Sequence, residues 1–349
     1  MGPDKFDVTD QQRRDVYETV FNRFAFGKPS LSLPRLILVG AQPGAGKSRV
    51  AIRARKELKK LGMPVMADID DIRPDYPDVE AVFKEFPFKM SAVTNKECWG
   101  WTSHLLLDAR HAKNNVVYQA TIRHANRIGD LIKDFQKEGF AVDLFTVAAN
   151  AKHSVYGIFR RFEDDIEKMM DGSERVPRWV PIPFHNQVYK VFPQNVDYLA
   201  ENARLERVGV FSRDGKDLYF SEDRLIHRGA GDALVKEQQR LWSPEERGDH
   251  NNAWKVLLER IETRAAGILK PKWYVRTARL YAVEAEYFAL AQELCAGSPP
   301  SGLVVVHRTP NHHFVKTDGG LLVSYENARN HAVGSAKHFA PKPATRDPK

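Results

Sequence analysis

The residues with the clearest capacity for chemistry form a glycine-rich segment, Gln42-Pro43-Gly44-Ala45-Gly46-Lys47-Ser48. Its glycines permit a tight turn in which successive backbone N–H groups point at one anion. A lysine and a serine directly after such a turn hold the β- and γ-phosphates of a nucleotide and a Mg²⁺ ion. The segment therefore predicts a phosphate-binding P-loop, with Lys47 on the phosphates and Ser48 on the metal. It departs from the usual motif at the first glycine, where Ala41 follows Gly40.

The sequence on both sides of this segment predicts the elements that a P-loop needs. Residues 36–39 are four apolar residues, two of them β-branched, as expected of a strand covered on both faces. A helical pattern runs from Lys47 to about Leu61 and ends at Gly62 and Pro64, so its positive N-terminus would face the same anion. The alternative is an ordinary glycine-rich turn before a helix. The preceding apolar strand and the lysine–serine pair favour the P-loop, because an ordinary turn needs neither.

Strands and helices alternate over the following hundred residues. Strands are predicted at 65–70, 115–118 and 140–147, and helices at 101–113, 124–138 and 154–170. This alternation is typical of an α/β protein whose parallel sheet has helices on both faces and binds ligands at the carboxyl ends of its strands. Those ends carry the P-loop, the acidic pair Asp68 and Asp70, and the segment from Gln119 to Arg123. The candidate residues should therefore meet at one edge of the sheet.

Two carboxylates could activate an acceptor hydroxyl. Asp70 ends the second predicted strand, 23 residues after Lys47, and would face the γ-phosphate. Asp68 lies two residues earlier and is expected on the same face of that strand. Phosphoryl transfer also needs positive charge around the phosphates, and four arginines lie on or just after the helix at 154–170: Arg160, Arg161, Arg175 and Arg178. A solvated acidic turn and a solvated basic helix face are the alternatives that remain open.

Composition restricts the class of protein. The chain has 349 residues, 42% hydrophobic and 28% charged, which suits a soluble protein of one elaborated domain or two domains. It has no run of about 18 uncharged apolar residues and no signal-peptide pattern. Its two cysteines match no disulfide or metal motif, so we expect a cytoplasmic protein. The net charge of +8 fits an anionic small substrate, a nucleic acid or an acidic protein, but the basic residues are scattered, which disfavours nucleic acid.

The pattern changes after Arg207. Residues 208–220 are typical of a hairpin closed through Asp214-Gly215, residues 232–294 are helical, and short strands are expected at 303–307 and 321–325. Residues 9–26 form a separate helical pattern that Thr9 or Asp10 could cap. We therefore predict an N-terminal helix (1–35), a nucleotide-binding core (36–222), a mostly helical extension (223–298) and a small strand-containing tail (299–349).

These motifs, in this order, resemble the zeta toxin family, the P-loop kinases of epsilon/zeta and PezAT-type toxin–antitoxin systems. The resemblance covers roughly residues 36–220. It is carried by the P-loop, by Asp68-Ile69-Asp70 followed by Tyr76-Pro77, by Ala120-Thr121-Ile122-Arg123, by Arg161-Phe162-Glu163, by Arg178-Trp179-Val180-Pro181 with His185, and by Phe211 through Tyr219. Residues 221–349 are outside it.

The resemblance implies a P-loop kinase-like fold and transfer of a phosphate from ATP, with Mg²⁺, to a hydroxyl of a nucleotide-sugar. UDP-N-acetylglucosamine is the substrate of the family, its product poisons cell-wall synthesis, and a separate antitoxin chain neutralises the toxin. On this chain the resemblance makes Asp70 the base and places Arg161 and Arg178 on the ATP phosphates. Thr121 and Arg123 match the substrate-side strand end, and we expect them to bind the substrate together with Asp68, Ser103 and Gln119.

Two positions depart from the family. It carries acidic residues in the substrate pocket where this chain has Ser103 and Gln119. The two missing carboxylates would accept hydrogen bonds from substrate hydroxyl groups. Their loss leaves the kinase residues intact but leaves the identity of the phosphate acceptor undecided. A related branch of the fold, a secreted effector of plant-pathogenic bacteria, phosphorylates NAD, so a dinucleotide acceptor in a host cytoplasm is the first alternative. A nucleic-acid-directed P-loop ATPase is the second.

Overall fold

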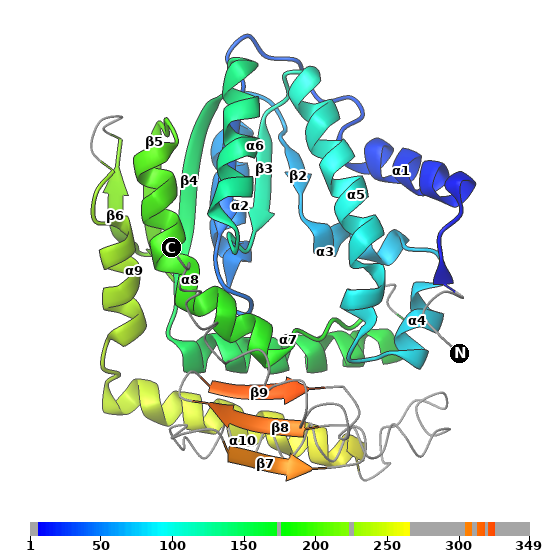
Figure 1. The fold of residues 1–349 in the computed structure, drawn as a ribbon, viewed down its shortest axis with the longest axis vertical. Coiled ribbons are helices and arrows are strands. Elements are labelled where there is room, and N and C mark those ends of the chain that lie inside the picture. Colours follow the sequence, from blue (N-terminus) through cyan, green and yellow to red (C-terminus); the bar gives the residue numbers. More distant parts are fainter. Residues whose placement is uncertain are drawn as a thin grey trace, which may run out of the picture.

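The computed structural model describes residues 6–172, 176–222 and 227–265, together with three strands between 304 and 324. A six-stranded sheet in the order β2-β3-β1-β4-β5-β6 forms its centre (Figure 1). The strands are β1 (Arg35–Gly40), β2 (Val65–Ala67), β3 (Val116–Ala120), β4 (Ala141–Ala148), β5 (Arg207–Ser212) and β6 (Asp217–Ser221). The first five are parallel and β6 is antiparallel to β5. The predicted parallel α/β sheet and the predicted hairpin are confirmed.

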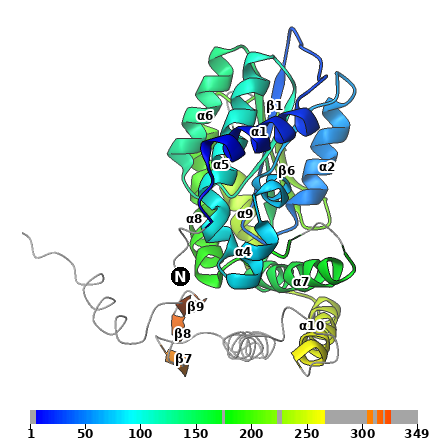
Figure 2. The same ribbon diagram turned by 90° about the vertical axis from the view of Figure 1, so that its right-hand side faces the viewer.

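Helices cover both faces of this sheet. Figure 2 shows α2 on one side, and α5 and α6 on the other. The helices of the core are α1 (Asp10–Phe24), α2 (Lys47–Leu58), α3 (Ile69–Ile72), α4 (Val79–Glu85), α5 (Met90–His111), α6 (Ala125–Lys137), α7 (Ala151–Met170) and α8 (Ile182–Asn202), with a short 3-10 helix at Arg73–Asp75. Thr9 caps α1 as predicted, in a capping box with Gln12. None of the described helices is long and apolar enough to cross a membrane.

Burial explains why β1 can present the P-loop rigidly. Residues 36–39 of β1 are completely buried between the helix layers. At the opposite end of the sheet the buried Asp143 of β4 is bridged by Arg35 of β1, at 2.8 Å, and Arg207 of β5, at 2.6 Å. A buried carboxylate is tolerated when cations of this kind pair with it. The adjacent strands β1, β4 and β5 are therefore tied together at the end remote from the P-loop.

Several element boundaries differ from prediction. Helix α5 begins at Met90, whereas the sequence pattern placed its start near Trp101, and α4 and α8 were not predicted. The helical region predicted over 232–294 consists of α9 (Ala230–Gln239) and α10 (Pro244–Ala265) in the described part, and its remainder, 266–294, lies outside the described residues. The tail forms a second, antiparallel sheet of β7 (Val304–Arg308), β8 (His313–Thr317) and β9 (Gly320–Ser324), of which β8 was not predicted.

Candidate active site

The P-loop has the backbone geometry of an anion cradle. Gly44 and Gly46 have φ angles of 76° and 95°, in the left-handed region that favours glycine. Gly46 is the N-cap of α2 and has no side chain with which to cap the helix, and the first turn contains no acidic residue. The N–H groups at this end of α2 therefore remain open to a phosphate. Lys47 and Ser48 occupy the first turn, so the residues fit a nucleoside triphosphate with Mg²⁺.

Neighbouring elements hold the P-loop in this shape. Buried Gln42 donates from Nε2 to the carbonyl oxygen of Ala149, at 2.9 Å. Arg213, in the turn after β5, donates to the carbonyl oxygen of Gly44 at 3.3 Å. Helix α7 packs so closely that a Cβ atom at Gly157 would lie 2.3 Å from the carbonyl oxygen of Gly44. A glycine at 157 is thus required for this contact.

The acidic pair is arranged differently from the sequence expectation. Strand β2 ends at Ala67, and Asp68 is the N-cap of the short helix α3, accepting a hydrogen bond from the backbone N–H of Asp70 at 2.9 Å. The expectation that Asp68 and Asp70 share one face of a strand was therefore wrong. The physical reason is that an aspartate competes for nearby backbone N–H groups and so favours a helix cap over continued strand.

Three arginines converge on Asp70. Arg178 approaches its carboxylate at 2.5 Å, Arg161 of α7 at 3.3 Å and Arg73 at 3.7 Å. Burial by itself would raise the pKa of Asp70, but the charges of Arg178, Arg161 and Arg73 outweigh burial and hold that pKa well below its ordinary value. Asp70 is therefore ionised throughout the physiological pH range.

Asp68 and Lys47 have the opposite perturbations. Burial and the negative charge of Asp70 raise the pKa of Asp68 to about 6. Burial lowers the pKa of Lys47 to about 8, although the charge of Asp68 opposes that change. The two carboxylates, two residues apart, thus have well-separated pKa values, which is a recurring feature of acid–base sites.

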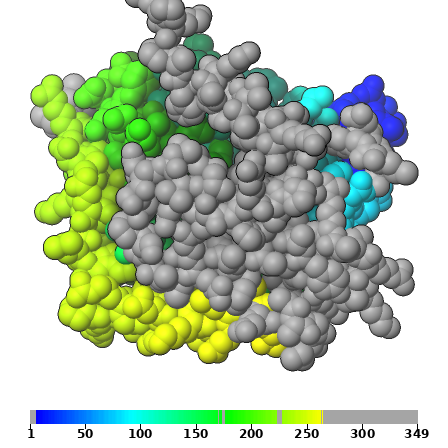
Figure 3. Space-filling view, turned by 60° about the horizontal axis from the view of Figure 1, so that its bottom comes forward, coloured from blue at the N-terminus to red at the C-terminus, as the bar shows by residue number. Residues whose placement is uncertain are grey.

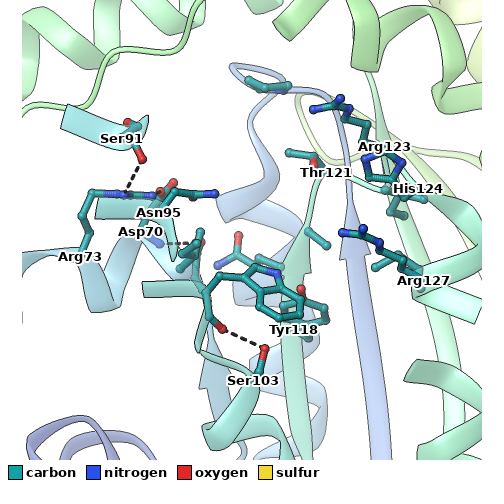
Figure 4. Close-up of a pocket in the computed structure, with 18 of the residues that line it drawn as sticks. Asp70, Arg73, Ser91, Asn95, Ser103, Tyr118, Thr121, Arg123, His124 and Arg127 are labelled. Carbon is teal, nitrogen blue, oxygen red and sulfur yellow. Dashed lines mark hydrogen bonds and ion pairs between the residues drawn. The ribbon is translucent and has the colours of Figure 1, made fainter. Parts of the chain in front are cut away.

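A cavity of about 1100 Å³ joins these groups to the predicted substrate side. Lys47, Asp70 and Arg178 line it. So do all five residues predicted to bind substrate: Asp68, Ser103, Gln119, Thr121 and Arg123. Figure 4 shows Asp70, Arg73 and Asn95 on one side of the cavity, and Arg123, His124 and Arg127 on the other. Of the other candidate arginines, Arg160 pairs with Asp164 and Arg175 lies outside the described residues.

Several residues of the cavity were missed by the sequence analysis. Arg73 is nearly fully buried and donates to Thr94 of α5, so its guanidinium is fixed against Asp70. Its position three residues after Asp70 is the signal that could have revealed it. Ser91, Asn95 and Trp99 were also missed; they precede the predicted Ser103 at four-residue intervals along α5, and all four line the cavity. This helical spacing was hidden because the predicted helix began at 101.

The turn after β3 is held in a strained conformation. Ile122 has φ +48°, a rare value for a β-branched residue. Its side chain occupies the space beside Gly40, where a Cβ atom would lie 2.1 Å from Ile122 Cδ1. Asn195 of α8 donates from Nδ2 to the carbonyl oxygens of Ile122 and Arg123, at 2.7 and 3.0 Å. Glycine at position 40 therefore leaves room for the turn that carries Thr121 and Arg123.

His185, which belongs to the same sequence motif as Arg178, joins two helices. Its Nε2 is hydrogen bonded to Ser154 Oγ of α7 at 2.7 Å, and its Nδ1 to Asn186 at 2.9 Å. Burial lowers its pKa to about 4, so the ring is neutral at physiological pH. Its contacts give it a structural function between α7 and α8.

The extension contacts α7, the helix that carries Arg161. Asn150 caps α7 and donates to the carbonyl oxygen of Gln238 in α9, at 2.8 Å. Trp254 of α10 is fully buried, with its ring centroid 5.3 Å from that of Phe159. Arg260 of α10 pairs with Asp164 at 3.0 Å. In Figure 3, the lime and yellow of α9 and α10 follow the left and lower edges of this face of the molecule.

A mostly parallel sheet with a P-loop after β1 and a carboxylate after β2, both lining one cavity, defines a P-loop protein of the kinase-like class. The family model described as "Zeta toxin" matches residues 21–224. This chain belongs to the zeta toxin family.

Individual relatives agree with this assignment. "Toxin PezT" of Streptococcus pneumoniae is 23% identical over 241 residues, which are 69% of this chain and 92% of that protein. "Toxin zeta" of Streptococcus agalactiae is 22% identical over 215 residues, 62% of this chain and 73% of that protein. A solved structure from the PezAT toxin–antitoxin system of S. pneumoniae superposes with a TM-score of 0.60 at 21% identity, covering 74% of this chain and 100% of that one. It supports the kinase-like fold.

Proposed function

We propose that this protein is an ATP-dependent kinase that transfers the γ-phosphate to a hydroxyl of a nucleotide-sugar such as UDP-N-acetylglucosamine. The observation that carries the proposal is the position of Asp70, an ionised carboxylate in the same cavity as Lys47 and in contact with Arg161 and Arg178. A base and a set of phosphate-binding cations in one cavity are the parts that phosphoryl transfer requires.

Each group has a defined role in the proposed reaction. Asp70 accepts the proton of the acceptor hydroxyl as its oxygen forms a bond to the γ-phosphorus, while the bond from that phosphorus to the bridging oxygen of ADP breaks. Lys47 and the P-loop N–H groups hold the β- and γ-phosphates. Arg161 and Arg178, which pair with Asp70 in this structure, turn toward the transferred group. Ser48 would hold Mg²⁺, which neutralises phosphate charge.

A dinucleotide such as NAD is the second candidate acceptor. Ser103 uses its hydroxyl within α5, donating to the carbonyl oxygen of Trp99 at 2.8 Å, and Gln119 has no negative charge. The described cavity therefore offers no carboxylate at these two positions to bind sugar hydroxyl groups. This observation favours an acceptor with fewer hydroxyl groups that need a hydrogen-bond acceptor in this part of the cavity.

Purified protein tests the activity directly. ATP and Mg²⁺ are supplied with UDP-N-acetylglucosamine or NAD, and phosphorylated product is quantified by mass spectrometry. Lys47→Ala is the matched inactive control, because it removes the cation on the transferring phosphate. A phosphorylated acceptor with wild type but not with Lys47→Ala supports the proposal, and equal turnover in the two proteins would end it.

We further propose that the kinase acts as a toxin that a separate antitoxin chain neutralises. The solved structure of the PezAT system and the net charge of +8, which would attract an acidic partner, support this. Expression of the chain alone should slow growth, and Lys47→Ala at the same level should not. Normal growth at high expression of active wild-type protein would count against toxicity.

A further inference from the structure

Three guanidinium groups surround the carboxylate of Asp70, which is more positive charge than this one carboxylate neutralises. Two of the three arginines, Arg161 and Arg178, turn toward the transferred phosphate in the proposed reaction. A buried carboxylate left without any cation would tend to take up a proton, because burial disfavours its ionised form. Asp70 therefore needs one cation that stays with it during the reaction.

The contacts of Arg73 differ from those of the other two arginines. Its side chain is 4% exposed, against 19% for Arg178 and 45% for Arg161. Its Nη1 donates to Thr94 Oγ1 and, at 3.5 Å, to the carbonyl oxygen of Ser91, both on α5 (Figure 4 shows the contact with Ser91). Burial and these two contacts hold Arg73 in place, whereas the other two side chains are more exposed.

The point on α5 to which Arg73 is anchored is itself fixed. Thr94 is completely buried, and its hydroxyl donates to the carbonyl oxygen of Met90 at 2.9 Å. Because the hydroxyl hydrogen is used in this way, the oxygen is left to accept from Arg73. The contacts on α5 are with uncharged groups, and the second terminal nitrogen of Arg73, Nη2, lies 3.7 Å from Asp70 Oδ1. Asp70 is the one carboxylate with which Arg73 pairs in the part of the chain that the structure describes.

Arg73 and Arg178 face the same oxygen of Asp70. Arg178 approaches Oδ1 at 2.5 Å and Arg73 at 3.7 Å, but neither contact has hydrogen-bond alignment, and this buried oxygen makes no hydrogen bond with any described residue. When Arg178 moves to a phosphate, Oδ1 therefore has a free position for the hydroxyl of the acceptor. Arg73 is then the cation that remains beside that oxygen.

We infer that Arg73 is a positioning residue for the reaction: it stays with Asp70 and fixes the direction of its carboxylate while Arg161 and Arg178 bind the transferred phosphate. The inference rests on the proposed function, since it gives Asp70 the proton of the acceptor. Further ionisable groups face Asp70 from its own segment and from neighbouring elements: Asp68, Lys47 of α2, Cys98 of α5, Arg161 of α7 and Arg178 before α8. The cations among them all have phosphates to bind, so none replaces Arg73.

The first test measures kcat and the acceptor KM against pH for Arg73→Gln, with the acceptor that the wild type phosphorylates. Loss of the charge should move the acidic limb of kcat upward by about 1–3 pH units, the usual effect of an arginine on a neighbouring carboxylate, whereas KM should change less than about threefold. Arg73→Lys keeps the charge but lacks the rigid fork, so kcat should fall while the limb moves by less than about one pH unit.

The matched control is Arg207→Gln, which removes an arginine from the buried carboxylate of Asp143 at the other end of the sheet. It should lower stability and leave the acidic limb where it is in wild type. Circular dichroism establishes folding of every variant. If Arg73→Gln does not fold, Thr94→Val replaces it: loss of the anchor should lower kcat about tenfold, and no loss would count against the inference.

A second measurement needs no turnover. Carbon-13 NMR follows the Asp70 carboxylate, assigned by its absence from Asp70→Asn, between about pH 4 and 9 with Mg²⁺ and a non-hydrolysable ATP analogue bound. Asp70 should take up its proton about 1–3 pH units higher in Arg73→Gln than in wild type. An unchanged kcat limb and an unchanged carboxylate titration in folded Arg73→Gln would overturn the inference, even if the kinase is active. Conversely, a wild type that transfers no phosphate would reject the kinase proposal, and the NMR titration would still decide whether Arg73 keeps Asp70 ionised.

Discussion

Replacement of Asp70 by asparagine should change phosphoryl transfer and ATP binding in opposite directions. The amide could not take a proton, so phosphoryl transfer should fall about 10²- to 10⁴-fold, the usual contribution of a general base. ATP binding should respond in the opposite direction. Asp70 pairs with Arg161 and Arg178 in this structure, and loss of its charge frees both guanidinium groups for the phosphates.

The size of the second effect follows from distance. An acceptor oxygen about 3 Å from both Asp70 and the γ-phosphorus puts the carboxylate about 6 Å from the γ-phosphate. Two unit charges at that separation repel by about 3 kcal/mol at an effective dielectric constant of 20. Screening by salt and Mg²⁺ reduces this to about 1–2 kcal/mol. Asp70→Asn should therefore bind ATP about 5- to 30-fold more tightly.

Calorimetry with ATP and acceptor-dependent turnover are measured on the same samples, with circular dichroism to establish folding. Asp71→Asn removes an exposed charge one residue away and should leave both quantities within about threefold. Asp68→Asn should reduce turnover less than Asp70→Asn. Weaker ATP binding by folded Asp70→Asn would refute the reasoning about the arginines, and a larger loss at Asp68 would move the base there.

Three further outcomes test other parts of the molecule. Asn195→Asp replaces two donated hydrogen bonds by repulsion of two carbonyl groups, so the acceptor KM should rise about tenfold or more while ATP affinity is unchanged; equal changes in both would contradict a positioning function. Trp254→Ala should lower the free energy of unfolding in urea by about 3–5 kcal/mol, because it removes a fully buried tryptophan, and no change would mean that α10 does not dock on α7. Because the pKa of Asp68 is raised to about 6, the folded protein binds an extra proton between about pH 4 and 6, and its free energy of unfolding falls as pH rises through that range. Asp68→Asn, which keeps the helix cap, should therefore become more stable relative to wild type over the same range. A difference in unfolding free energy between the two proteins that does not change with pH would contradict the raised pKa.

The sequence predicts the P-loop, the sheet and the meeting of distant motifs, because these depend on local patterns. Four consecutive apolar residues define β1, and the carboxyl ends of parallel strands must share one edge, which brings Asp70 and Thr121 near Lys47. The same reasoning fails where a short-range competition or a tertiary contact decides. Helix α3 has only four residues, too few for a periodic pattern. The segment was therefore predicted as the end of a strand, and the capping function of Asp68 was missed.

Helix α8 shows a second reason for failure. It contains Pro183 in its first turn and Pro193 within it, and prolines usually mark a break. A proline is tolerated in the first turn, and Pro193 is a buried residue of the helix. Without α8, Asn195 has no visible relation to the turn of Ile122, since 73 residues separate them. Such positioning residues are visible only in the folded chain.

The most direct test of the kinase proposal is mass spectrometry of a cell metabolite extract incubated with the protein and ATP labelled with ¹⁸O at the γ-phosphate. Wild type should transfer one labelled phosphate to one or a few nucleotide-linked metabolites, and Lys47→Ala and Asp70→Asn should not. Release of labelled inorganic phosphate without any labelled metabolite, from a wild-type protein that binds ATP, would contradict phosphoryl transfer to a small-molecule hydroxyl.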